Sequence, residues 1–395
     1  IDGLRKKLRL PAWLTPRTAL LIFLPVYAAV AVAVDLGRSA NQAVVPQDFE
    51  VVVRARDRIA AGMDPYVLTD DIPYKYSPFA TLPYFLLPDS HAAGWMIYEL
   101  LVMLGWVAVL GLGVPALDWR KAGLVALGAV LSWKGIRETL DFGQAEFLFL
   151  GIGVVAAWLF NRRPLEGALL IGILPWIKLP WGFVWIPFIA EAVLRKDHRR
   201  LPQLGLGLLV SSLACGVVLP ALALGPTRAW ELTVSWHRLV TSQPRALFET
   251  RWNQSIWQSL ERWFGHDLGS SWPVRAIVVV LAAAAIRSLI RGMARRRPSG
   301  PLAWISPWFL LNQLLSPLGW SWGNLLVAGA PLASEDATLR KRSPALHWAL
   351  VVMIAAGWII QQKPVAPLFG LERWDDFFSF GSVTLFWLSL LLFVI

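Results

Sequence analysis

Long apolar runs recur along the whole of this chain, and polar segments of limited length separate them. Runs of roughly 15–25 apolar residues suit helices that cross a bilayer, whereas the strands of a membrane barrel alternate over only about 10 residues. Only 16% of the residues are charged, compared with roughly 25% in a soluble domain. The pattern predicts an all-α, polytopic integral membrane protein, with residues 1–395 forming a single membrane domain.

The apolar runs predict about twelve crossings, with both chain ends on the same side. The crossings are expected at residues 19–34, 90–114, 122–133, 142–160, 164–176, 181–194, 204–224, 274–290, 301–315, 322–333, 345–360 and 378–395. The first run resembles a signal sequence, but no small-residue cleavage site follows it, so we interpret it as an uncleaved helix. The apolar patch at 79–87 is too short to span and is expected to dip into the interface.

Basic clusters flank the apolar runs instead of gathering on one soluble face. They lie at residues 5–9, 162–163, 195–200, 291–297 and 340–342. This arrangement follows the positive-inside rule and places those loops in the cytoplasm. The net charge of +11 is therefore explained by the flanks of the membrane segments, and no nucleic-acid partner is predicted.

The same rule places two longer polar loops on the outer side of the membrane. These loops are residues 38–89 and 225–272. The second contains amphipathic stretches at 229–240 and 256–264, which are expected to be helices lying in the interface plane. The polar surface of the protein is thus expected to gather on its outer side.

Several kinds of catalytic or metal site are excluded by the residues present. The sequence has one cysteine, Cys215, and five scattered histidines, so neither an intrachain disulfide nor a zinc spacing is predicted. It has no nucleotide-binding glycine loop and no GxSxG motif. The adjacent Asp70 and Asp71 could bind a divalent cation, but such pairs in turns are usually solvated. No metal and no cofactor is therefore predicted.

Asp48 opens the most polar part of the first outer loop. It is expected to lie about a dozen residues past the first membrane helix, at the start of a helical pattern with apolar positions 49, 52, 53, 59 and 60. One interpretation is a carboxylate that satisfies free N–H groups at a helix start. The other is a carboxylate that performs chemistry. Glu50 and Arg54 are spaced for an i,i+4 ion pair.

Lys178 lies between two apolar halves, with prolines on both sides. A charge at such a position marks a ligand site or pathway, or it snorkels to the interface. A broken hairpin at Lys178 is expected, because one long helix would place its two basic flanks on opposite sides. Further polar residues occur at other outer helix ends, namely Lys134, Arg137, Gln144, Asn253, Gln254, Trp320 and Trp322.

The order of these motifs resembles the C-type superfamily of glycosyltransferases that use polyprenyl-phosphate sugars. More narrowly, it resembles the family 87 α-mannosyltransferases of the phosphatidylinositol mannoside type. The matching residues in the first loop are Asp48, Phe49, Arg54, Ala55, Gly62, Pro65, Tyr66, Tyr76 and Pro78.

Later motifs of that group follow in the same order, with some departures. The later matches are Gly143-Gln144, Lys178 with Pro180, Asn253-Gln254-Ser255, and Ser316-Pro317 with Trp320. Glu146 replaces an Asn, and Gly319 replaces a Ser. Trp322-Gly323 stands where the group often has a His pair. That last departure bears on the sugar and the acceptor, not on the general class.

The resemblance implies a C-type fold with outer interfacial helices in a bacterial inner membrane. It implies transfer of a sugar, expected to be mannose, from a polyprenyl-phosphate donor to a lipid or glycan hydroxyl with inversion. Asp48 would be the general base. Donor-phosphate binding would fall to Arg54, Lys75, Arg137 and Lys178. Sugar or acceptor binding would fall to Glu50, Tyr76, Gln144, Asn253, Gln254, Trp320 and Trp322.

Two alternatives remain at this level. A transporter or flippase of lipid-linked intermediates also uses broken helices and buried charges. Against it, the polar residues are expected to concentrate on one face, not at mid-membrane. A non-catalytic membrane scaffold would have no need for Asp48 together with this ordered set of polar motifs.

Overall fold

The computed structural model describes residues 14–42, 47–67, 73–88, 90–113, 144–197, 199–242 and 271–295, together with isolated positions between 11 and 311. All regular elements in these segments are helical, as the apolar pattern predicts. The predicted spans at 322–333, 345–360 and 378–395, most of those at 122–133 and 301–315, and the amphipathic stretch at 256–264 lie outside the described residues.

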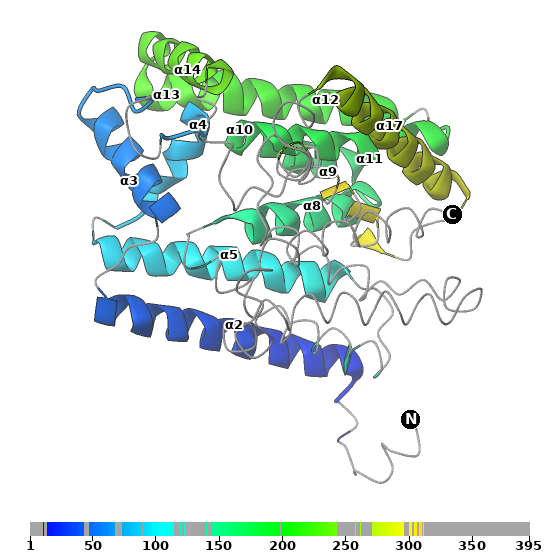
Figure 1. Ribbon diagram of the computed structural model, residues 1–395. Helices are drawn as coiled ribbons and strands as arrows, with labels where there is room; N and C mark the ends of the chain where they lie inside the picture. Colours follow the sequence, from blue (N-terminus) through cyan, green and yellow to red (C-terminus); the bar gives the residue numbers. More distant parts are fainter. Residues whose placement is uncertain are drawn as a thin grey trace.

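Three long helices lie side by side and form the base of the structure (Figure 1). They are α2 (Pro16–Gln42), α5 (His91–Gly113) and α8 (Glu146–Phe160). Glycines allow α5 and α8 to approach closely, because a Cβ atom on Gly105 would lie 2.6 Å from Leu148 Cα. Small residues at such crossings favour tight helix packing in membranes.

Four helices in the described part of the chain are long and apolar enough to cross a membrane. These spans are Pro16–Val34, Ala92–Val109, Arg200–Leu224 and Trp272–Arg291. Three shorter apolar helical segments accompany them, at Glu146–Phe160, Pro164–Ile177 and Trp181–Leu194. The described segments thus make a helical membrane protein, and the predicted twelve crossings are not all present in them.

The first helix is longer than its apolar run predicted. α2 continues through polar residues to Gln42, and α3 (Gln47–Ala60) begins a few residues later. Asp48 therefore lies only a few residues beyond the end of α2, not a dozen residues past it. The helix continues because no proline or glycine pair interrupts residues 35–42.

The chain between Pro164 and Leu194 is the broken hairpin that the charge pattern predicted. It comprises α9 (Pro164–Gly172), α10 (Leu174–Ile177), the 3-10 helix η2 (Leu179–Val184) and α11 (Trp185–Leu194). Lys178 is extended at the break, with φ −141° and ψ 107°. Arg195 Nη2 donates to Asn161 Oδ1 at 3.4 Å. The end of α11 therefore returns to the end of α8, and both basic flanks lie at one end of the structure.

A second bent span follows the hairpin. α12 (Arg200–Leu213) passes through one π-helical turn, η3 (Ala214–Val218), into α13 (Leu219–Leu224). Gly225, with φ 84°, reverses the chain into α14 (Pro226–Thr241). A positive φ of this kind strains any residue with a side chain, so glycine is required at the turn. α17 (Trp272–Arg295) packs against α11.

The helix α3 connects two apolar cores. Phe49 and Val53 are buried in the main core between the long helices. Val52 and Ile59 are buried in a second core with residues of α14. Ala60, which the helical pattern placed on the apolar face, is exposed. Packing on two sides holds α3 across the ends of α5 and α8.

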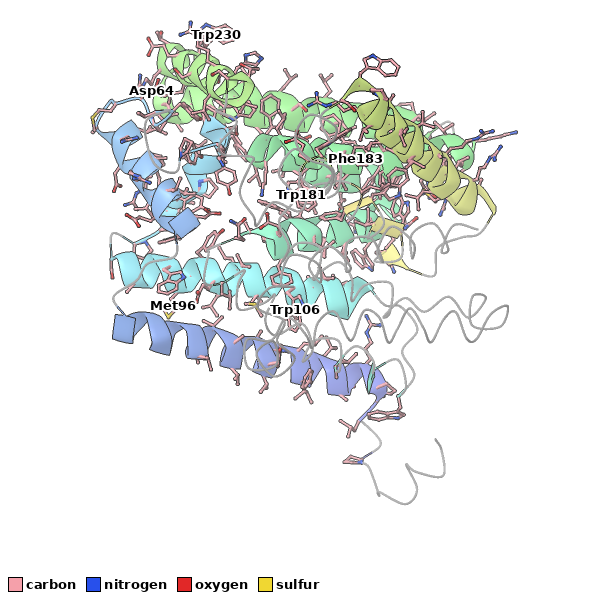
Figure 2. All side chains as sticks on the ribbon, viewed as in Figure 1. Asp64, Met96, Trp106, Trp181, Phe183 and Trp230 are labelled. Carbon is pink, nitrogen blue, oxygen red and sulfur yellow. The ribbon has the colours of Figure 1, made fainter. Side chains whose placement is uncertain are left out.

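α14 is the helix that the amphipathic stretch at 229–240 predicted, and its apolar face packs against other parts of the protein. Leu232, Trp236 and Leu239 are buried against α3 and the loop after it. Trp230, on another face of the same helix, is 70% exposed and points outward in Figure 2. The apolar patch at 79–87 likewise forms short helices, α4 (Pro78–Thr81) and η1 (Leu82–Leu86).

Candidate functional site

Asp48 lies in the first turn of α3, at the end of the structure where α5 and α8 begin. Gln144, which is buried just before α8, donates from Nε2 to Asp48 Oδ2. The Asp48 side chain therefore contacts the start of α8, a segment far away in the sequence. This placement brings together two residues that sequence reasoning assigned to the same site.

Burial, two lysines and a glutamate determine the pKa of Asp48. Burial raises the pKa of the Asp48 carboxyl from 3.8 to about 7. The charge of Lys178 lowers this pKa, that of Glu146 raises it, and that of Lys75 lowers it. Burial also lowers the pKa of the Lys75 ammonium, an effect that Asp48 opposes. The predicted residues Asp48, Lys75 and Lys178 thus share one electrostatic environment.

Glu146 belongs to this environment, although sequence reasoning did not assign it to the site. Lys178 Nζ donates to Glu146 Oε1 at 2.6 Å, and the Glu146 side chain is only 4% exposed. Its other oxygen, Oε2, is buried without a hydrogen-bond partner in the described part of the chain. The sequence held one clue to the role of Glu146. It is an acidic residue at the start of an otherwise apolar run, at the position where the family 87 α-mannosyltransferases have Asn.

Asp48 lies on the wall of a mainly apolar, partly open cavity of about 270 Å³. Four tyrosines surround the same space, and the remaining lining residues are almost all apolar. The tyrosines are Tyr74, Tyr76, Tyr84 and Tyr98. Leu101 of α5 also lines the cavity and is 45% exposed, so the cavity reaches the outer surface of that helix.

Burial makes two of these tyrosine hydroxyls harder still to ionise than that of an ordinary tyrosine. The pKa values of Tyr76 and Tyr84 are both raised above 10 by burial, and the charge of Asp48 adds to the effect. A protonated phenol can donate one hydrogen bond and accept others. The cavity therefore combines an apolar wall with hydroxyl groups near one carboxylate.

Hydrogen bonds fix the loop that carries Lys75 and Tyr76. Trp236 Nε1 of α14 donates to Lys75 O at 3.0 Å. Tyr66 OH donates to Tyr76 O at 3.0 Å. Ser77 Oγ donates to the carbonyl oxygen of Trp176, next to the Lys178 break. The loop is thus held between α14 and the broken hairpin, which positions both lysines.

Not every predicted residue joins this site. Glu50 is exposed, and neither it nor Arg54 is among the residues that line the cavity. Residues two positions apart on a helix do not face the same way, which explains why Glu50 diverges from Asp48. The structure records no ion pair between Glu50 and Arg54 in the segments that it describes.

Five predicted residues lie outside the described part of the chain. They are Arg137, Asn253, Gln254, Trp320 and Trp322. Asp70 and Asp71 also lie outside it. Among the residues that the structure does describe, no cluster of three His, Cys, Asp or Glu side chains could hold a metal ion.

The apolar helices and the charged cluster define an integral membrane protein with a polar site at one end of its helices. The family model "Glycosyltransferase family 87" matches residues 74–317, which is more than half of the chain. The chain belongs to this family and is a glycosyltransferase. The matched range includes Lys75, Gln144 and Lys178, whereas Asp48 precedes it.

No curated protein and no solved structure matches the chain. Membership of a glycosyltransferase family confirms the enzyme class, and it does not favour a transporter of lipid-linked intermediates. Because the activity requires a sugar donor and an acceptor hydroxyl, the remaining question is which groups of this chain receive them.

Proposed function

We propose that this enzyme transfers mannose from a polyprenyl-phosphate donor to a lipid or glycan hydroxyl, with inversion, on the extracytoplasmic side of a bacterial inner membrane. One observation supports this proposal above the others. The Asp48 carboxylate is under the influence of Lys75 and Lys178 and lies on the wall of an apolar cavity that reaches the surface of α5. That combination suits a substrate with a charged phosphate and an apolar chain.

Asp48 is the general base in this proposal. Its carboxylate takes the proton of the acceptor hydroxyl while the hydroxyl oxygen bonds to the anomeric carbon of the sugar. The bond between that carbon and the phosphate oxygen breaks, and polyprenyl phosphate leaves. Attack opposite the leaving phosphate inverts the anomeric centre. A pKa of about 7 suits a base that works near neutral pH.

Lys178 and Lys75 stabilise the phosphate as it leaves. Negative charge grows on the phosphate oxygens in the transition state, and preorganised cations stabilise that charge. Before the donor binds, Lys178 is held by Glu146 at 2.6 Å. Donor binding then adds the phosphate as a second anionic partner of Lys178. A monophosphate held by two lysines requires no metal ion in this scheme.

Gln144 and Tyr76 are assigned to the polar part of the substrates. Gln144 orients the Asp48 carboxylate through its amide, and it retains a carbonyl oxygen that can accept from a sugar hydroxyl. Tyr76 lines the cavity beside Asp48. The apolar walls formed by residues such as Phe79, Leu101 and Leu148 suit the first isoprene units of the donor.

The experiment presents a panel of labelled polyprenyl-phosphate sugars to the purified enzyme in nanodiscs with an extract of total membrane lipids. The proposal expects one labelled glycolipid, formed from the mannose donor and carrying an inverted anomeric configuration by NMR. A product with retained configuration would contradict the single displacement. Transfer only from a different sugar would replace mannose and leave the rest of the mechanism in place.

A further inference from the structure

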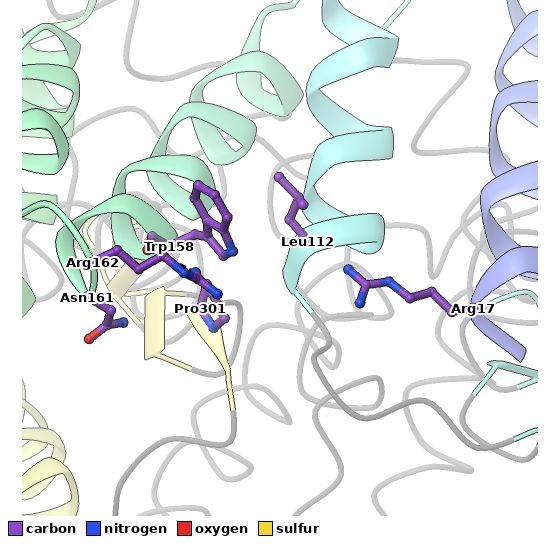
Figure 3. A pocket seen from close by; sticks show the side chains of 6 residues that line it. All are labelled: Arg17, Leu112, Trp158, Asn161, Arg162 and Pro301. Atoms are coloured by element: carbon purple, nitrogen blue, oxygen red, sulfur yellow. Dashed lines mark hydrogen bonds between the residues drawn. The ribbon is translucent and has the colours of Figure 1, made fainter.

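A second cavity, of about 330 Å³, lies at the other end of the long helices. Its lining comes from the start of α2, the end of α5, the end of α8 with the turn after it, and Pro301. The lining residues are Arg17, Leu112, Trp158, Asn161, Arg162 and Pro301 (Figure 3). α5 begins beside Asp48 and ends here. Its 23 residues span about 35 Å at 1.5 Å per residue, which is comparable to the apolar thickness of a membrane.

Two arginines enter this cavity, one from α2 and the other from the turn after α8. Figure 3 shows the guanidinium groups of Arg17 and Arg162 extending into the space between α2, α5 and α8. The structure records no carboxylate partner for either group within the residues that it describes. Neighbouring cations differ in this respect, because Arg163 pairs with Glu166 at 3.1 Å. Within the described residues, the cavity therefore has positive charge without a matching carboxylate.

The Arg162 guanidinium is held in position by a tryptophan. Its Cζ atom lies 4.2 Å from the centre of the Trp158 ring, and Nη1 makes a long contact of 3.5 Å with Trp158 O. Stacking on an aromatic face leaves the in-plane N–H groups of arginine free to bind the oxygens of an anion. Asn161 is less available, because its amide already bonds to Ala157 O at 3.1 Å and to Arg195 at 3.4 Å.

The position of the cavity limits which anion can occupy it. It opens at the helix ends that carry the basic flanks, and both Arg17 and Arg162 are exposed. Positively charged flanks of membrane helices lie at the level of the lipid headgroups on the cytoplasmic side. A tryptophan at the same level is typical of the membrane interface. These features suit the phosphodiester of a phospholipid headgroup.

We propose that the cavity between Arg17 and Arg162 binds the phosphate of an anionic membrane phospholipid. The two guanidinium groups hold the phosphodiester oxygens, and Trp158 and Leu112 contact the glycerol region. Occupation of this site would join the first turn of α2 to the end of α8 through one lipid. The proposal is independent of the donor and the acceptor, because the site lies at the opposite end of the helices from Asp48.

The test measures binding of dioleoylphosphatidylglycerol to the purified enzyme in a neutral detergent, by native mass spectrometry and by the shift of the thermal unfolding midpoint. Dioleoylphosphatidylcholine and inorganic phosphate are titrated in parallel. The proposal expects saturable binding of the anionic lipid. It expects binding at least tenfold weaker in the variant Arg17→Gln/Arg162→Gln. The matched control Arg163→Gln removes a neighbouring charge outside the cavity and should bind as the wild type does.

Several results would overturn the proposal. Equal binding of the zwitterionic lipid would show that the phosphatidylglycerol charge is irrelevant. If Arg163→Gln weakens lipid binding as much as the double variant does, any basic residue at these helix ends is enough to bind the lipid. If inorganic phosphate at the same concentration raises the thermal unfolding midpoint as much as the lipid does, the site binds a free anion instead of a lipid. If the double variant does not fold, Arg17→Gln is titrated alone, and wild-type affinity in that variant would count against the site.

Discussion

Lys178 Nζ donates to Glu146 Oε1 at 2.6 Å and thereby joins the break in the hairpin to the first turn of α8. The contact holds a cation at the end of the helices where Asp48 lies. It also compensates a carboxylate that is only 4% exposed. The ion pair thus contributes both to the packing of the hairpin and to the charge of the candidate site.

The first prediction concerns the energy of this ion pair. Lys178→Met should lower the free energy of unfolding by about 2 kcal/mol, because it leaves a buried carboxylate unpaired; the figure is reduced for the partial exposure of Lys178. The double variant Glu146→Gln/Lys178→Met should recover part of that loss. Unfolding by SDS titration of all the variants measures the coupling. Strictly additive effects would show that the two side chains do not interact.

The second prediction concerns the pH dependence of transfer. Because burial raises the pKa of Asp48 to about 7, kcat/KM should rise as the pH increases towards 7 and then level off, since only the ionised base accepts a proton. Glu146→Gln should move this acid limb to lower pH, because the Glu146 charge raises the pKa of Asp48. An acid limb near 3.8, the ordinary value, would contradict the assignment of the limb to a buried Asp48.

The third prediction applies the same pKa shift to stability. The folded state binds the Asp48 proton more tightly than the unfolded state does, so the contribution of this group is most favourable below pH 3.8 and is lost as the pH rises towards 7. Asp48→Asn should therefore raise the unfolding midpoint at pH 8 relative to the wild type, and less so at pH 4. Thermal unfolding at both pH values measures this difference. A variant that is destabilised more at pH 8 than at pH 4 would refute the sign.

The fourth prediction concerns the contact between Gly216 and Trp176. Gly216 lies in the π-helical turn, and a Cβ atom there would overlap the Trp176 ring. Gly216→Ala should displace Trp176, whose carbonyl oxygen accepts from Ser77, and should cost about 1–3 kcal/mol in the free energy of unfolding. Transfer should fall as well, because the Ser77 contact fixes the loop that carries Lys75.

Gly205→Ala is the matched control for this substitution. Gly205 lies in the same bent span, and nothing stands within 4 Å of the position of its Cβ atom. It should therefore leave transfer unchanged, with stability equal to the wild type or higher by up to about 1 kcal/mol. If both glycine variants behave alike, the position of Trp176 does not matter for the site.

Local sequence patterns were sufficient to predict some features of the fold. The hairpin break at Lys178 followed from its flanking prolines and from the basic residues at both ends. α14 followed from the helical spacing of apolar residues such as Leu232 and Trp236. These features depend on neighbours within a few residues, which is the range over which periodicity and charge flanks carry information.

Other features depend on contacts between distant residues, and they were missed. The partnership of Glu146 with Lys178 joins positions 32 apart, and nothing in either local pattern specifies it. The apolar face of α14 packs against α3. The two helices are far apart in the sequence, so the local pattern of neither one indicates this contact. The resemblance assigned Glu50 to the site, but Glu50 is exposed and lies two positions from Asp48 on α3, so the two side chains point in different directions. The π-helical turn at Ala214–Val218 left no signal in the apolar pattern.

The most direct test of the account compares transfer by wild type, Asp48→Asn and Glu50→Gln, with labelled polyprenyl-phosphate-mannose and an extract of total membrane lipids. Removal of a general base costs on the order of 10²–10⁴ in rate, so Asp48→Asn should lose at least a hundredfold in kcat while its unfolding transition remains cooperative. Glu50→Gln, which changes an exposed carboxylate in the same helical turn, should retain activity. Equal transfer by wild type and Asp48→Asn would contradict the central claim that Asp48 is the catalytic base.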